Sequence, residues 1–144
     1  MLNSQRVKIL QNGSYQGRSV LYWMNRDKRV KDNWALLEAQ NLAIEKKAPL
    51  IVCFQYFGKF KEANIRQYSF LIKGLLELSN DLKLLNIDFY LIQGRAKHSI
   101  LKIINDNSIG ALFVDYNPLK SYKRKIHNVV NRVSIPVYQV DAHN

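Results

Sequence analysis

Five short apolar segments alternate along the chain with four helix-like segments, and this alternation constrains the fold more than any other feature. The apolar segments span residues 19–24, 50–57, 87–93, 111–115 and 136–140. The second is apolar almost throughout, which is typical of a strand covered on both faces. Strands that alternate with helices form right-handed βαβ units. The sequence therefore predicts an α/β fold: a Rossmann-like, doubly wound parallel sheet of five strands with helices on both faces.

The intervening segments carry apolar residues at helical spacing. The first stripe consists of Ala35, Leu36, Ala39, Leu42 and Ala43, and the second of Tyr68, Leu71, Ile72, Leu75, Leu78, Leu82 and Leu85. Ile100, Ile103 and Ile104 form the third, and Leu119, Tyr122, Ile126, Val129, Val130 and Val133 form the fourth. Asp32 is the predicted N-cap of the first helix, and Asn64 with Gln67 resembles a capping box before the second. Asn117 is the predicted cap of the fourth helix, with Pro118 in its first turn.

A chain of 144 residues suits one domain. Residues 1–17 are polar and contain Gly13 and Gly17, so we interpret them as an N-terminal arm that precedes a domain at 18–144. No apolar run approaches the roughly 20 residues that a membrane span needs, and the N-terminus has no secretory signal, so no membrane partner is expected. Because Cys53 is the one cysteine, an intrachain disulfide is excluded and a reducing, cytoplasmic setting is expected.

The last predicted strand, at 136–140, is followed by four residues and no closing helix. More chain is expected at the carboxyl end of a strand in this fold, and we therefore expect the sequence to be a fragment of a longer protein. The chain carries 22 Lys and Arg against 11 Asp and Glu, a formal net charge of +11. Such an excess favours polyanions, including nucleic acid, but it also occurs in proteins with no such partner.

Open parallel sheets bind ligands outside the carboxyl ends of their strands. The loops at those ends are 24–33, 57–64, 94–97 and 115–118. The first contains four cationic residues and two carboxylates, which could hold an anionic or polar planar ligand. The alternative is an Arg–Asp network that fixes the loop and caps the helix. Asp115 and Asn117 also have two possible roles. They could accept hydrogen bonds from a ligand, or they could simply cap the following helix.

Several common sites are absent from the sequence. It has no G-x-G-x-x-G or Walker loop, so no phosphate-binding motif is predicted. His98, His127 and His143 show no metal-ligand spacing, and we predict no metal site. The sequence shows no recognisable pair of a nucleophile and a general base. The residues alone therefore predict no catalytic site.

Two long segments of the chain resemble a known family. The segment from Tyr22 to Leu37, YWMNRDKRVKDNWALL, resembles the opening of class II cyclobutane-pyrimidine-dimer DNA photolyases. The segment from Pro136 to Asn144, PVYQVDAHN, resembles the end of the N-terminal α/β domain in that family. Between them, RQYSFL at 66–71 and DYNPL at 115–119 resemble segments of the same family in residue type and occur in the same order. The resemblance covers about residues 18–144.

The resemblance implies that the chain is the N-terminal domain of such a photolyase, with a sheet ordered 3-2-1-4-5. In the family, a C-terminal helical domain holds FAD and the damaged DNA, and the N-terminal domain often holds an antenna chromophore: a deazaflavin, a folate or a flavin. The full-length protein would be a deoxyribodipyrimidine photolyase, a carbon–carbon lyase, whereas this chain alone is not expected to be catalytic. By topology, the antenna site would comprise Met24, Asn25, Arg26, Asp27, Phe54, Gln55, Tyr56 and Asp115.

Three other functions stay open from the sequence. The chain could be a structural module that docks the helical FAD domain without binding an antenna, which predicts an exposed apolar patch around 136–140 and the chain end. It could be a basic DNA-binding module, whose affinity would fall steeply with salt. An unrelated nucleotide-binding protein of the universal-stress type ranks last, because its glycine-bearing phosphate loop is absent.

Overall fold

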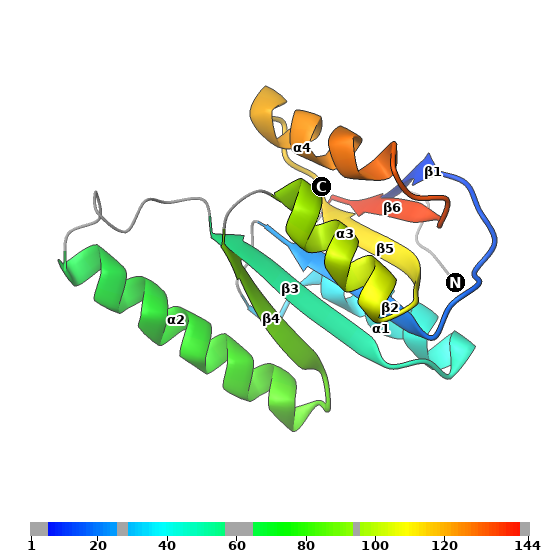
Figure 1. The fold of residues 1–144 in the computed structure, drawn as a ribbon. Helices are drawn as coiled ribbons and strands as arrows, with labels where there is room; N and C mark the ends of the chain where they lie inside the picture. The colour runs from blue at the N-terminus through cyan, green and yellow to red at the C-terminus, as the bar shows by residue number, and fades with distance from the viewer. Residues whose placement is uncertain (1–5, 26–28, 57–64, 94–95, 142–144) are drawn as a thin grey trace.

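The computed structural model describes residues 6–25, 29–56, 65–93 and 96–141. Strands and helices alternate along most of the chain (Figure 1). The elements are β1 (Val7–Gln11), β2 (Ser19–Met24), α1 (Trp34–Lys46), β3 (Leu50–Tyr56), α2 (Ile65–Leu84), β4 (Asp88–Gln93), α3 (Ala96–Asp106), β5 (Ile109–Asp115), α4 (Lys120–Val130) and β6 (Val137–Val140). The predicted α/β class and the four predicted helices are confirmed.

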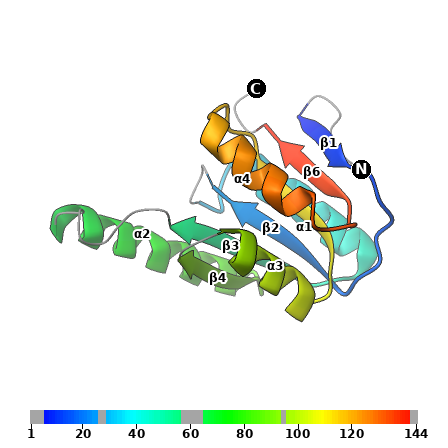
Figure 2. The same ribbon diagram turned by 45° about the horizontal axis from the view of Figure 1, so that its top comes forward.

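The sheet has six strands in the order β1-β6-β5-β2-β3-β4. Five of them run parallel, from β6 through β5, β2 and β3 to β4, while β1 pairs antiparallel with β6 at one edge (Figure 2). The predicted five-stranded sheet of order 3-2-1-4-5 is therefore not the complete sheet, because β1 adds a sixth strand that the sequence analysis did not assign.

Strand β1 lies in the segment that we interpreted as an arm. Val7 pairs with Val140 and Lys8 with Gln139. The side-chain Nε2 of Gln11 donates to the carbonyl oxygens of Val133 and Ile135 at 2.7 and 2.8 Å, which ties the end of β1 to the α4–β6 connection. Residues 7–11 thus belong to the sheet, and the domain boundary at residue 18 stays a prediction.

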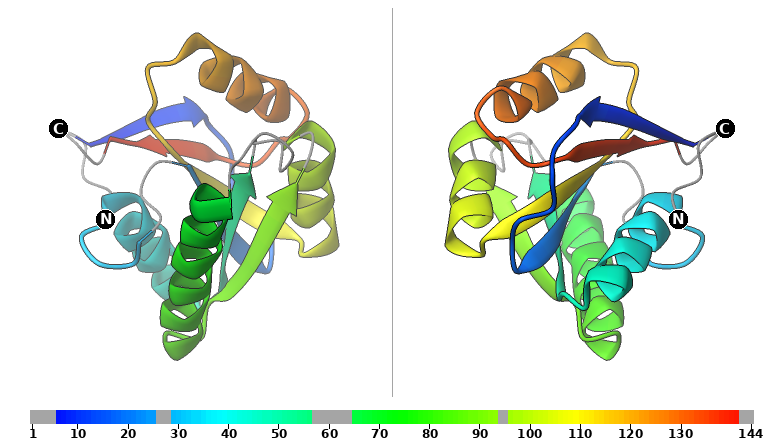
Figure 3. Two further views of the ribbon diagram at one scale, coloured as in Figure 1. Left: turned by 90° about the vertical axis from the view of Figure 1, so that its left-hand side faces the viewer. Right: turned by 90° about the vertical axis from the view of Figure 1, so that its right-hand side faces the viewer.

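Helices cover the sheet on both faces, as the sequence predicted. One core lies between the sheet and the helices α1 and α2, and it contains Tyr22, Met24 and Phe113. The other lies between the sheet and the helices α3 and α4, and it contains Trp23 and Cys53. Figure 3 shows the two helix pairs on opposite sides of the sheet. Alternate residues of each central strand enter opposite cores, which explains why those strands are almost continuously apolar.

The helix caps differ from the predicted ones. Asn33, not Asp32, is the N-cap of α1, and its Oδ1 accepts from the amide of Leu36 at 2.9 Å. Asp32 has a φ of 57°, in the left-handed region, so the chain has not yet turned into the helix there. Helix α4 begins at Lys120 with Leu119 as its N-cap, so Asn117 does not cap it and Pro118 is not in its first turn. The predicted cap at Asn64 lies outside the described residues.

Among the described residues, most of the large exposed apolar side chains lie away from β6. Val137 and Val140 of β6 are fully buried, since β1 covers that edge of the sheet. Many of the large exposed apolar residues lie at the opposite edge, on α2 and β4: Tyr68, Phe70, Leu76, Leu84, Tyr90 and Leu91. Others lie elsewhere, among them Ile9 of β1, Ile44 of α1 and Leu119. No helix in the described part of the chain is long and apolar enough to cross a membrane.

Candidate ligand-binding site at the carboxyl ends of β2 and β5

Asp115 ends β5 and lies beside the end of β2, at the centre of the sheet. Its side chain is 4% exposed. Oδ1 accepts a hydrogen bond from the Tyr22 hydroxyl at 2.8 Å, and Oδ2 accepts from the backbone amide of Asn25 at 2.7 Å. Hydrogen bonds to a carboxylate are stronger than those between neutral groups. The buried charge thus holds the first residue after β2 against the end of β5.

Asn33 extends this network into helix α1. Its Nδ2 donates to the Tyr22 hydroxyl at 3.1 Å and to the carbonyl oxygen of Arg29 at 3.1 Å, while its Oδ1 caps the helix. The same side chain therefore fixes the loop before α1, the start of α1 and the hydroxyl that binds Asp115. These contacts belong to the core face that α1 covers.

Two asparagines bridge the strand ends nearer the surface. Asn117 Nδ2 donates to Asn25 Oδ1 at 3.0 Å, and Asn117 Oδ1 accepts from the amide of Leu119 at 3.0 Å. From the other core, the Tyr122 hydroxyl of α4 donates to the backbone carbonyl of Asp115 at 2.9 Å. Asn25 and Asn117 thus join the ends of β2 and β5, and Tyr122 fixes Asp115 from the other face of the sheet.

The electrostatics of the two tyrosines follow from their burial. Burial raises the pKa of Tyr22 well above its ordinary value of 10.0, and the negative charge of Asp115 raises it further. Burial and then Asp115 likewise raise the pKa of Tyr122. Both hydroxyls therefore stay protonated at neutral pH and act as donors to Asp115.

Among the residues predicted for an antenna site, the structure brings Met24, Asn25 and Asp115 together on neighbouring strands, with Phe54 opposite Met24 in the sheet. Met24, Phe54, Gln55 and Asp115 are buried, and Asn25 is half-buried. Arg26, Asp27 and the side chain of Tyr56 lie outside the described residues. The assignment of these eight residues to a chromophore stays a prediction.

The alternative that the sequence offers for the loop after β2 is an Arg–Asp network. In its described part, an Arg29 guanidinium nitrogen lies 3.4 Å from the backbone carbonyl of Asp32, and that contact does not involve the carboxylate. At the two described ends of this loop, Asp115 binds the amide of Asn25 and Asn33 binds the carbonyl of Arg29. Sequence reasoning missed Tyr22, Asn33 and Tyr122. A tyrosine inside a buried strand is a usable signal, because a buried hydroxyl needs a hydrogen-bond partner.

A cavity of about 220 Å³ opens beside this network, between the loop and α1. Its wall includes Val30, Asn33, Trp34 and Leu37. Trp34 is 39% exposed, and the Arg6 guanidinium lies 4.2 Å from the centre of its ring. The guanidinium thus covers one face of the Trp34 ring, and the ring lies beside Asn33, whose side chain caps α1. Within the described ranges, no group of three His, Cys, Asp or Glu side chains could hold a metal ion.

Comparisons with known proteins identify relatives of this chain. The sequence model of the DNA photolyase family matches residues 20–144. A deoxyribodipyrimidine photo-lyase of Arabidopsis thaliana is 40% identical over 96% of this chain, and one of Potorous tridactylus is 37% identical over 99%. These matches cover 29% and 28% of the two relatives. The chain therefore spans less than a third of their length.

Solved structures show the same fold at low sequence identity. A bacterial class III photolyase from Agrobacterium tumefaciens superposes with a TM-score of 0.70 at 20% identity, over 90% of this chain and 27% of that one. A cryptochrome from Synechocystis gives a TM-score of 0.68 at 15% identity, over 86% of this chain and 26% of that one.

Proposed function

Because the chain belongs to the DNA photolyase family, we propose that it is the N-terminal α/β domain of a class II deoxyribodipyrimidine photolyase. In this proposal the domain binds an antenna chromophore and docks a C-terminal helical domain that holds FAD and damaged DNA. The observation that carries the chromophore role is the network around Asp115, which fixes the loops at the carboxyl ends of β2 and β5. The class II assignment rests on the segments at 22–37 and 136–144.

An aromatic chromophore requires a flat apolar wall and a few polar anchors in rigid surroundings. Met24 and Phe54 lie side by side on β2 and β3 and belong to the core beneath the strand ends, which gives the proposed site rigid apolar surroundings. The Asn25 and Asn117 amides are held by their mutual hydrogen bond and supply polar groups at the rim. These residues fit a deazaflavin, a folate or a flavin, and Arg26, Asp27, Gln55 and Tyr56 complete the proposed site. When bound, the chromophore absorbs light and passes excitation to FAD.

Docking of the helical domain is proposed at the edge formed by α2 and β4. Phe70 and Leu84 are 81% and 82% exposed there, and Tyr68, Ile72 and Leu76 line one hollow along α2. Exposed apolar surfaces of this kind are typical of interaction sites. The repair reaction, and the binding of damaged DNA, belong in this proposal to the helical domain; the α/β domain harvests light.

Reconstitution tests the chromophore role. The chain is incubated with deazaflavin, folate or flavin, passed over a gel-filtration column and examined by ultraviolet and visible absorbance. One chromophore should co-elute at a ratio of about one per chain, and Asn25→Ala should retain about tenfold less, because the variant loses a fixed amide at the rim. Asn105→Ala, an exposed position on α3, should retain as much as the unchanged chain. If no chromophore is retained, the structural docking module becomes the better description.

A further inference from the structure

A second cavity, of about 290 Å³, lies on the opposite face of the sheet, between α4 and the edge strands β1 and β6. It is separate from the eight residues of the proposed antenna site. Its lining residues are Lys8, Leu10, Tyr116, Tyr122, Lys123, Ile126, His127, Val130 and Gln139. None of them is acidic, so the cavity wall carries positive charge without a compensating carboxylate.

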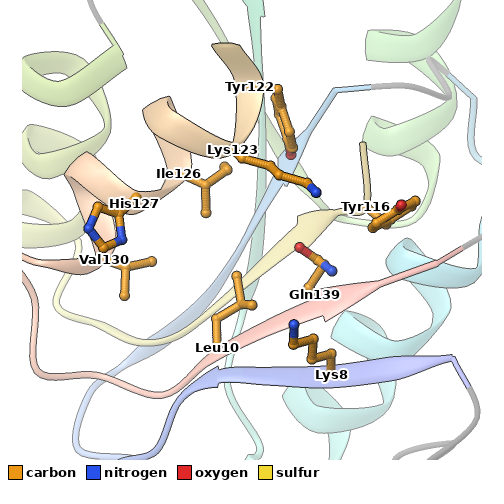
Figure 4. A pocket seen from close by; sticks show the side chains of 9 residues that line it. All are labelled: Lys8, Leu10, Tyr116, Tyr122, Lys123, Ile126, His127, Val130 and Gln139. Carbon is orange, nitrogen blue, oxygen red and sulfur yellow. The ribbon is translucent and has the colours of Figure 1, made fainter. Parts of the chain in front are cut away.

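One end of this cavity is cationic and polar. Figure 4 shows the ammonium groups of Lys8, from β1, and Lys123, from α4, both directed toward the side-chain amide of Gln139 on β6. Lys8 and Gln139 are paired residues of adjacent strands, and Gln11 anchors β1 to the α4–β6 connection. Lys8 and Lys123 are both exposed, and two positive charges at one end of a cavity favour the binding of an anion there.

The other end of the cavity is apolar. Leu10, Ile126 and Val130 lie there in Figure 4, beside the imidazole of His127. His127 Nε2 lies 3.0 Å from the Asn131 amide nitrogen. Apolar side chains at one end and paired cations at the other match a molecule that carries an anionic group on an apolar ring.

We propose that this cavity binds a small organic phosphate, with the phosphate group between Lys8 and Lys123 and an apolar ring against Leu10, Ile126 and Val130. Phosphate is favoured over a carboxylate because its two negative charges match two ammonium groups. The Gln139 amide, which has both a donor and an acceptor, can pair with polar groups of the ligand. Nucleoside monophosphates have this combination and are the first class to test.

The test is isothermal titration calorimetry of the 144-residue chain with adenosine monophosphate, adenosine and inorganic phosphate. Adenosine monophosphate should bind at one site. Adenosine should bind at least about tenfold more weakly, because it lacks the group that pairs with the lysines. Inorganic phosphate should also bind at least about tenfold more weakly, because it leaves the apolar end empty. Equal affinity of inorganic phosphate and the nucleotide would refute the role of the apolar end.

A pair of double variants with equal charge locates the site. K8Q/K123Q should lower the affinity for adenosine monophosphate at least about tenfold. K73Q/K83Q removes the same charge from exposed positions on α2 and should leave the affinity unchanged. Lys8→Arg keeps the charge and should keep binding, which separates lost charge from a disturbed strand. No measurable binding at millimolar nucleotide, or equal losses in the two double variants, would overturn the proposal.

Discussion

Asp115 joins three elements through one buried side chain. Its carboxylate accepts from the Tyr22 hydroxyl of β2 and from the amide of Asn25, and its backbone carbonyl accepts from Tyr122 of α4. A buried carboxylate is stable only when hydrogen-bonded donors replace the water that it loses. The stability of the fold should therefore depend on both carboxylate oxygens of Asp115 being acceptors, and not only on the size of the side chain.

Replacement of Asp115 by asparagine keeps the size but turns one acceptor into a donor. That donor would face either the Tyr22 hydroxyl or the Asn25 amide, both of which now donate to the carboxylate. Asp115→Asn should lower the free energy of unfolding by about 1–3 kcal/mol. Asp106→Asn removes the same charge from an exposed position and should change it by less than about 0.5 kcal/mol. Urea denaturation measures both, and equal effects would contradict the role of Asp115.

The two buried tyrosines should make the stability of the fold depend on pH in the alkaline range. The folded state raises the pKa of Tyr22 and Tyr122 above 10.0, so folded protein retains protons that the unfolded chain releases. Their contribution to stability is complete below about pH 10 and is lost as the pH rises above it. Stability should fall by about 1.4 kcal/mol per pH unit for each tyrosine. In absorbance titrations at alkaline pH, these two should ionise only on unfolding; Tyr22→Phe should reduce the slope.

For single residues, the sequence predicts which residue types can cap a helix or end a strand, but not which residue takes that role. Asp32 and Asn33 are adjacent and both can cap a helix. The choice depends on Asp32 taking a φ of 57° and on Tyr22 lying within reach of Asn33. Those facts come from tertiary contacts between β2 and the loop. Asp115 was identified correctly as a residue at a strand end, but its donors lie 93 and 90 residues away in sequence.

Among the elements, β5 and the segment before β2 approach each other at two glycines. A Cβ on Gly17 would lie 2.5 Å from the Gly110 backbone nitrogen and 2.5 Å from the Ser108 carbonyl oxygen. The amide of Arg18 donates to that same carbonyl at 2.7 Å, which holds the backbones together. Gly17, which the sequence analysis used only to mark the arm, thus permits β2 to enter the sheet beside β5.

Two glycine substitutions should therefore have opposite effects. Gly17→Ala should destabilise the fold by about 1–3 kcal/mol, because backbone atoms must move to admit the methyl group. Gly74→Ala, in helix α2, meets no atom within 4 Å and should stabilise it by about 0.5–1 kcal/mol. Thermal unfolding followed by circular dichroism compares them. A stabilising Gly17→Ala would contradict the close approach.

Elements that are covered on both faces were the easiest to predict. The predicted strand at 19–24 matches β2, and the one at 50–57 matches β3 through Tyr56, with residue 57 outside the described residues. Strand β1 escaped prediction because its apolar residues, Val7, Ile9 and Leu10, stand in a mostly polar segment. Its place depends on pairing with β6, which lies about as far away in sequence as the chain allows.

At the scale of the whole molecule, the two faces of the sheet carry different candidate sites. The network around Asp115 fixes the strand ends near α1, and the basic cavity lies under α4 (Figures 1 and 4). The exposed apolar edge at α2 and β4 lies away from the edge strand β1. The sequence predicted parallel strands with a functional rim, but not which surfaces stay open, because that depends on how β1 closes one edge.

The apolar edge predicts association. The 144-residue chain should self-associate at high concentration through α2, because large apolar side chains are exposed there. Phe70→Glu with Leu84→Glu should shift sedimentation toward the monomer, whereas Lys97→Glu with Lys102→Glu on α3 should not. An unchanged association state in the α2 variant would assign the contact to another surface.

Backbone NMR during titration with the retained chromophore tests the central proposal most directly, since it locates the ligand on the fold. The account predicts saturable shifts of the amides of Met24, Asn25, Phe54 and Gln55, with little change in β1 and α4. Saturable shifts confined to other elements, with these four amides unmoved, would contradict the assignment of the antenna site to the carboxyl ends of the strands.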